Sequence, residues 1–92
     1  RHEARVRYHA SAAELRGRLA GGWGELTEGH DGTCVYETSD DELDWLVFRL
    51  IVPNVDFELL AAPPELRERL AATARRLDAA LARPASARRR PA

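Results

Sequence analysis

Residues 3–10 alternate between apolar and charged positions, which is the pattern of a strand with one buried face. Ala4, Val6 and Tyr8 share the apolar side. The opposite side consists of Arg5, Arg7 and His9. The pattern therefore predicts a strand that packs on a core through its even-numbered residues and exposes its charged ones.

The next segment, residues 11–22, has the spacing of a helix. Ser11 and Glu14 form a capping box, and the glycine pair at 21–22 is typical of a helix end. Residues 23–38 then predict a hairpin, because the letters GHDG separate two strand-like runs and tolerate the left-handed backbone of a tight turn.

A second helix is predicted from Ser39 to about Val52. Ser39 and Glu42 make another capping box, and apolar residues follow at positions i, i+3, i+4 and i+7. This apolar face comprises Leu43, Leu46, Val47 and Leu50. Trp45 lies just beside the face and widens it, and Pro53 breaks the helix.

Residues 55–60 alternate again and predict a fourth strand, which a double proline separates from a last helix. Proline lacks an amide donor and has a fixed φ, so it ends a strand and suits the first helical position. The apolar stripe of this helix consists of Leu66, Leu70, Thr73 or Ala74, Leu77 and Leu81. Residues 83–92 lack periodicity and are rich in Arg, so they are expected to form a disordered tail.

The predicted element order is β-α-β-β-α-β-α over residues 1–82. Two split βαβ units on one antiparallel sheet form the ferredoxin-like α+β plan, here with an additional C-terminal helix. We therefore expect one domain over residues 1–82 and a tail over residues 83–92.

Several short motifs, in this order and spacing, resemble those of a known family. They are the RVRY strand, the helix containing Leu15 and Arg16, the hairpin with the letters DG at 31–32, the DWLVFRL helix and the strand that ends in PPELRERL. Over residues 3–77 the chain is similar to the C-terminal extension (WCX) domain of bacterial WYL-domain transcriptional regulators. A glycine is common before the fourth strand in that family, whereas this chain has the letters IVPN there.

The resemblance implies a fold and a setting for the domain. It implies a ferredoxin-like fold that contributes to homodimer contacts or contacts the WYL domain, and that completes a sensory module for an unknown effector. DNA would be bound by a winged helix-turn-helix domain outside this chain. The chain begins at Arg1 and contains no Met, so we expect it to be part of a longer protein. The resemblance supplies no catalytic residues.

Charge and composition narrow the expected partners. Residues 1–82 carry ten Arg against fifteen acidic residues, a net charge of −5, which does not attract a phosphate backbone. The single cysteine, Cys34, excludes an internal disulfide and fits a reducing cytoplasm. No apolar run is long enough to cross a membrane, so we expect a soluble cytoplasmic protein without membrane contact.

The face formed by Arg5, Arg7 and His9 has two interpretations. In one, these residues form cross-strand ion pairs with Asp56, Glu58 and Glu37. In the other, the open sheet face is a docking site for an anionic effector, a nucleic-acid strand or another domain, because the guanidinium group binds carboxylate or phosphate through two parallel hydrogen bonds.

The remaining candidates favour packing over chemistry. The acidic run at 39–44 suits the positive end of a helix dipole, and we expect no metal and no cofactor. Cys34 is expected to pack in the core, and Tyr8 shares the buried face of its strand, unlike the exposed aromatics of RNA-recognition modules.

Two surfaces are candidates for partner contact. Trp45 is the strongest single residue, since a Trp beside an apolar stripe is either partial core or an interface anchor. The last helix can pack on its own sheet or pair with a second chain.

These observations predict a non-enzymatic regulatory and oligomerisation module. The alternative is an ACT-like regulatory domain that binds a small molecule. An acylphosphatase-like enzyme is disfavoured, because the letters HASAAEL lack a glycine-rich phosphate cradle and the only Asn, Asn54, lies in a distant turn.

Overall fold

The computed structural model describes residues 1–19 and 24–84. The elements follow the predicted β-α-β-β-α-β-α order. They are β1 (His2–Tyr8), α1 (Ala12–Arg16), β2 (Gly24–Glu28), β3 (Cys34–Asp40), α2 (Leu43–Ile51), β4 (Phe57–Ala61) and α3 (Pro64–Ala82). The glycine pair at 21–22 and most of the predicted tail lie outside the described residues.

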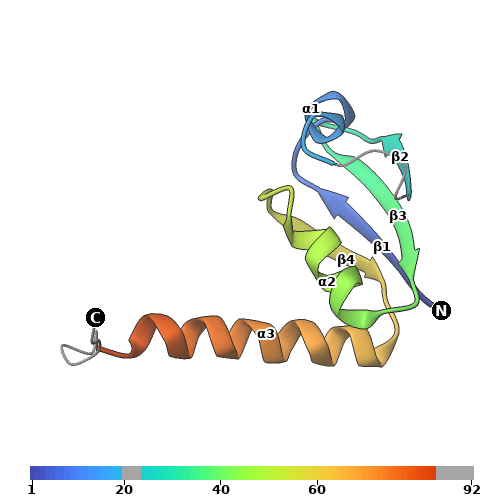
Figure 1. Cartoon of the computed structure of the whole chain (residues 1–92). Helices are drawn as coiled ribbons and strands as arrows, with labels where there is room; N and C mark the ends of the chain where they lie inside the picture. Colours follow the sequence, from blue (N-terminus) through green and yellow to red (C-terminus); the bar gives the residue numbers. More distant parts are fainter. Residues whose placement is uncertain (20–23, 85–92) are drawn as a thin grey trace.

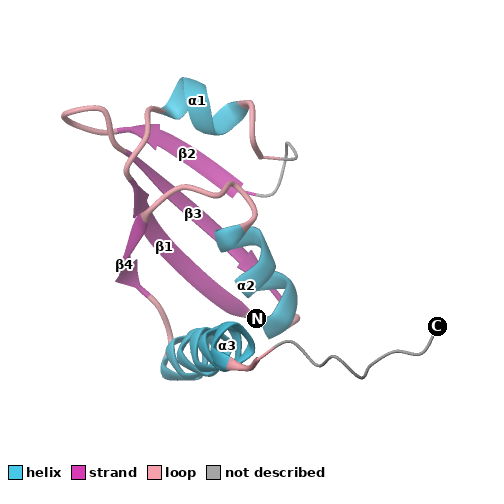
Figure 2. Cartoon of the chain, turned by 90° about the vertical axis from the view of Figure 1, so that its left-hand side faces the viewer, coloured by secondary structure: helices cyan, strands magenta, loops and turns pink. Residues whose placement is uncertain are grey.

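The four strands form one antiparallel sheet in the order β2-β3-β1-β4. Helices α1 and α2 lie on one face of this sheet, and the other face is open (Figures 1 and 2). The structure therefore confirms a mixed α+β fold with a C-terminal helix after the last strand.

The core lies between the sheet and its two covering helices. The predicted alternation of β1 is confirmed, because Ala4, Val6 and Tyr8 are buried. The other strand and helix residues of the core are Ala12, Leu15, Cys34, Tyr36, Thr38, Leu46, Val47, Leu50 and Leu66. Burying each large apolar side chain contributes about 1.5–3 kcal/mol, so this layer is the main source of stability.

Two turns depend on left-handed backbone. The hairpin between β2 and β3 has positive φ at Asp31 and Gly32, the pattern of a type I′ turn, and the Thr33 amide donates to the His30 carbonyl at 3.0 Å. Asn54, which follows the proline that ends α2, has a φ of 62°. Asn tolerates this conformation better than most residues, so Asn54 turns the chain between α2 and β4.

Two predicted helix boundaries are wrong. Helix α1 ends at Arg16 rather than at the glycine pair, although Ser11 does cap it by accepting from the Glu14 amide at 3.2 Å. The predicted Ser39–Glu42 capping box does not form, because β3 continues through Ser39 to Asp40. Asp40 replaces it: its carboxylate accepts from the Glu42 amide at 2.8 Å.

Helix α3 is the feature that gives the molecule its long axis. Its start packs beside α2. Its second half extends outward from the body, on the side of the sheet that α1 and α2 cover (Figures 1 and 2). At 1.5 Å per residue, a helix of this length spans about 28 Å, and the overall extents are 49 × 27 × 22 Å. The sequence left open whether this helix covers its own body or reaches outward, and it does both.

Candidate partner-binding surfaces

The open face of the sheet carries the predicted cationic residues in cross-strand pairs. Arg5 faces Glu37 on β3, with 3.1 Å between Nε and Oε2. Arg7 faces Glu58 on β4, with 3.1 Å between Nη1 and Oε1. His9 Nε2 lies 3.4 Å from the other oxygen of Glu58, and forms an ion pair when the imidazole is protonated.

These pairs set two carboxylates, Glu37 and Glu58, against the two arginines on the same sheet. Each side chain in them is about half exposed, and ion pairs of this kind contribute roughly 0.2–1 kcal/mol. An anion would have to displace Glu37 or Glu58 in order to bind. The structure thus brings the predicted pairs together, with the difference that Asp56 lies just before β4 rather than in it. Docking at Arg5, Arg7 or His9 stays a prediction.

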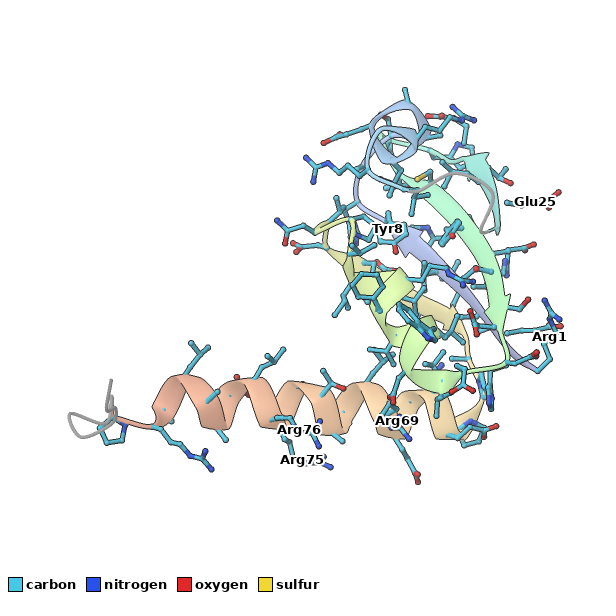
Figure 3. The ribbon with its side chains drawn as sticks, viewed as in Figure 1. Arg1, Tyr8, Glu25, Arg69, Arg75 and Arg76 are labelled. Carbon is cyan, nitrogen blue, oxygen red and sulfur yellow. The ribbon has the colours of Figure 1, made fainter. Side chains whose placement is uncertain are left out.

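A shallow hollow of about 540 Å³ lies on the same open face. Its lining residues are Glu3, Ala4, Arg5, Gly24, Glu25, Glu37, Thr38, Ser39, Ala61 and Ala62. Glu25 stands directly opposite Glu37 and points away from the helices (Figure 3). A side chain at Gly24 would collide with the Glu37 carbonyl oxygen, so glycine allows β2 to lie close to β3 at this end of the hollow. Three carboxylates against one Arg make the hollow acidic.

The outward side of α2 is apolar. Trp45 is 60% exposed, and its ring makes an edge contact with Phe48 at a centroid distance of 5.7 Å. Ile51 and Val52 continue this surface and are also exposed. The sequence singled out Trp45 but missed its three neighbours. The sequence of α2 is apolar on nearly all sides, and a domain this small cannot bury such a helix completely. This pattern could have predicted that further apolar residues of α2 are exposed.

The two halves of α3 differ in their surroundings. Leu66 is fully buried and Leu70 packs at the edge of the core. Arg69 Nη1 pairs with the Asp44 carboxylate on α2, beside which it lies in Figure 3. Leu77 and Leu81, on the same stripe, are 57% and 84% exposed. The predicted stripe is therefore continuous, but only its first half is covered.

A polar cluster joins the end of β3 to α2. Arg49 donates to the Thr38 hydroxyl at 2.9 Å, to the Ser39 carbonyl at 2.7 Å and to the Asp40 carboxylate at 2.5 Å. The Glu42 amide, with a further contribution from the Arg49 guanidinium, lowers the pKa of Asp40 below its ordinary value. This cluster fixes the start of α2, and with it the surface around Trp45.

The buried reactive groups are held in their neutral forms. Burial raises the pKa of the Cys34 thiol, which disfavours the nucleophilic thiolate. Burial also raises the pKa of Tyr8, whose hydroxyl donates to the Leu50 carbonyl at 2.6 Å. The predicted inward orientation of Tyr8 is confirmed. Within residues 1–19 and 24–84, no group of three His, Cys, Asp or Glu could hold a metal ion.

The architecture defines a small α+β domain with one covered sheet face and a projecting C-terminal helix. The model of the WCX domain family matches residues 1–77, so the chain belongs to this family, as the sequence motifs predicted. The WCX domain is associated with WYL proteins, which makes this chain a WYL-associated regulatory module.

The other comparisons add no relatives. No curated protein and no solved structure matches the chain. Among the helices that the structure describes, none combines the length and apolar character needed to span a membrane.

Proposed function

We propose that this domain is a non-enzymatic association module of a WYL-type transcriptional regulator. It joins two copies of the regulator, while DNA contact belongs to domains outside this chain. The observation that carries the proposal is the family match over residues 1–77. The exposed apolar surfaces of α2 and α3 support it, because contiguous apolar patches on small domains mark interaction sites.

We further assign the sheet to the ferredoxin-like plan. The order β2-β3-β1-β4 is that plan's order when it is counted from the other edge, and the first and second helices each connect strands separated by an intervening one. The assignment is compatible with an association role, because one face of the sheet is left uncovered by the described helices (Figure 2).

The test of the association function is light scattering after size exclusion on the 92-residue chain. We expect a dimer at micromolar concentration, at both low and moderate salt. A second assay would fuse the chain to a repressor DNA-binding domain that binds its operator only as a dimer. Repression in that assay supports the proposal, whereas a monomer at all concentrations together with an inactive fusion would refute it.

The acidic hollow gives the ACT-like alternative a specific form. Its carboxylates favour a small cationic ligand over an anionic effector, because Glu25 stands opposite Glu37 and Arg5 is the one cation against three carboxylates in the lining. Thermal-shift screening with amino acids and polyamines tests it, since a ligand that binds only the folded state raises the melting temperature. Glu25→Gln should abolish such a shift, and Glu68→Gln on α3 is the matched control.

A further inference from the structure

Among the residues that the structure describes, none covers the apolar stripe in the second half of α3. Every residue from Ala74 to Pro84 is exposed, including the leucines at 77 and 81. A helical stretch of this length is marginal in water unless tertiary packing supports it. The projecting half therefore presents a leucine surface that a partner must cover if the helix is to be stable.

The sequence of α3 repeats, at a spacing of seven, the contact that its first half makes with α2. Arg69 and Leu70 are followed by Arg76 and Leu77, and Arg83 stands just past the helix end, at a C-cap with extended backbone. Residues seven apart lie on nearly the same side of a helix. In the first half, Arg69 pairs with Asp44 on α2 and Leu70 packs at the edge of the core. Arg76 and Leu77 therefore repeat, in the second half, the two residue types that make these contacts.

The outward side of α2 matches that pattern. Trp45 and Phe48 offer an exposed apolar surface, and Asp41 and Glu42 add exposed acidic groups at its beginning. The projecting half of α3 offers Leu77 and Leu81, together with two arginines, Arg75 and Arg76, against one acidic residue, Asp78. Apolar surface would thus meet apolar surface, and negative charge would meet positive charge.

A straight α3 cannot fold back onto the α2 of its own chain, but a second copy can provide the contact. When two α3 helices lie antiparallel, the projecting half of each lies beside the first half of the other, and α2 packs against that first half. We propose that the projecting half of α3 docks on the outward side of α2 of a second copy, in a two-fold symmetric dimer. The inference rests on the proposed association function and assigns it a surface.

The symmetry doubles every contact, because the same patch is used twice. It also explains why Trp45 is exposed in the single chain: its ring would form the centre of each of the two contacts, where interface energy concentrates.

The first experiment removes the leucine surface. In the double variant Leu77→Ala/Leu81→Ala we expect the dimer to weaken on the order of 100-fold or more, measured by sedimentation equilibrium. Alanine is the best helix former, so the change does not weaken the helix itself. Trp45 emission in a Trp23→Phe background should shift to the blue when the wild-type dimer forms, and should not shift in this variant.

The second experiment tests which surfaces meet. One variant reverses charge on α3 with Arg76→Glu/Arg83→Glu, and the other reverses charge on α2 with Asp41→Arg/Glu42→Arg. Each variant alone should be mainly monomeric, because like charges face each other in both contacts. Their mixture should form a heterodimer, because both of its contacts are then complementary. Arg75→Glu is the matched control and should dimerise like the wild type, because two residues of separation place Arg75 about 160° around the helix from Leu77.

The outcomes separate this inference from the proposed function. If the wild type is monomeric throughout, both fail. If the wild type is dimeric and the leucine variant dimerises equally well, the association function stands and the α3-on-α2 contact is refuted. If the α2 charge variant alone dimerises normally, the partner's α3 does not dock on α2, and this contact is likewise refuted. Recovery of dimer only in the mixture establishes it.

Discussion

The two halves of α3 share one amphipathic pattern and have opposite surroundings. Leu66 is fully buried against the core, whereas Leu81, on the same stripe, is 84% exposed. The comparison shows that an apolar stripe indicates how much surface needs a cover, not which element supplies the cover. In the first half the cover is α2 of the same chain, and we infer that in the second half it is α2 of another copy.

Truncating the stripe in each half should produce the largest difference. Leu66→Ala should destabilise the domain by about 2–5 kcal/mol, because it leaves a cavity in a packed core. Leu81→Ala should change the stability of the monomer by no more than about 0.5 kcal/mol. Urea unfolding below the dimerisation concentration measures both. An equal loss in the two variants would show that the projecting half is packed in the monomer.

Loosening α2 should weaken the covered half indirectly. Tyr8→Phe removes the hydroxyl that donates to the Leu50 carbonyl, a buried acceptor near the end of α2. The expected loss is about 1–3 kcal/mol. Hydrogen exchange should then show faster opening of the first half of α3, with the second half unchanged. Unchanged exchange in the first half would mean that α3 does not depend on α2.

Alkaline pH tests the same core without mutation. Burial raises the pKa values of Tyr8 and Tyr36 above the 10.0 of an exposed tyrosine. The unfolded chain therefore loses these protons first, so their contribution is present below pH 10.0 and declines as the pH rises above it. Urea midpoints should fall in that range, and less steeply in Tyr8→Phe. Parallel slopes would exclude Tyr8 as a source.

The smallest effect should come from the arginines that flank the stripe. Arg69→Gln breaks an exposed ion pair with Asp44 and should cost roughly 0.2–1 kcal/mol in the monomer. Arg76→Gln, seven residues later, should leave the monomer unchanged. Thermal unfolding at low and high salt distinguishes them, because only the Arg69 contribution should decrease with salt. A salt-dependent loss in Arg76→Gln would contradict the comparison.

The sequence predicted the buried face of a strand and the conformation of a tight turn most reliably, because each follows from a fixed local pattern. The even-numbered residues of β1 had to face the core because a strand alternates, and the Asp-Gly turn had to adopt positive φ. Element ends were less predictable. Ser39 looked like a helix cap, but its pairing with Glu3 on β1 extends β3 by two residues, and Glu42 takes the N-cap position with its amide donating to the Asp40 carboxylate. Local sequence does not reveal such a competition between strand pairing and helix start.

The candidate surfaces were predictable in chemistry but not in extent. The charged face of β1 allowed both ion pairs and docking, and only the register of β3 and β4 shows that Glu37 and Glu58 face its arginines. Trp45 was identified from its place beside a stripe. Its neighbours Phe48, Ile51 and Val52 were not, because exposure on a short helix depends on how many helices cover the sheet.

The projecting half of α3 has a consequence for how this domain diverges. Residues 74–84 are exposed and lie outside the core, so natural selection on folding scarcely constrains them. Mutations there can accumulate in duplicated genes while the body of the domain stays intact. A few exchanges of leucine or arginine would then be enough to separate the descendants into copies that recognise only themselves.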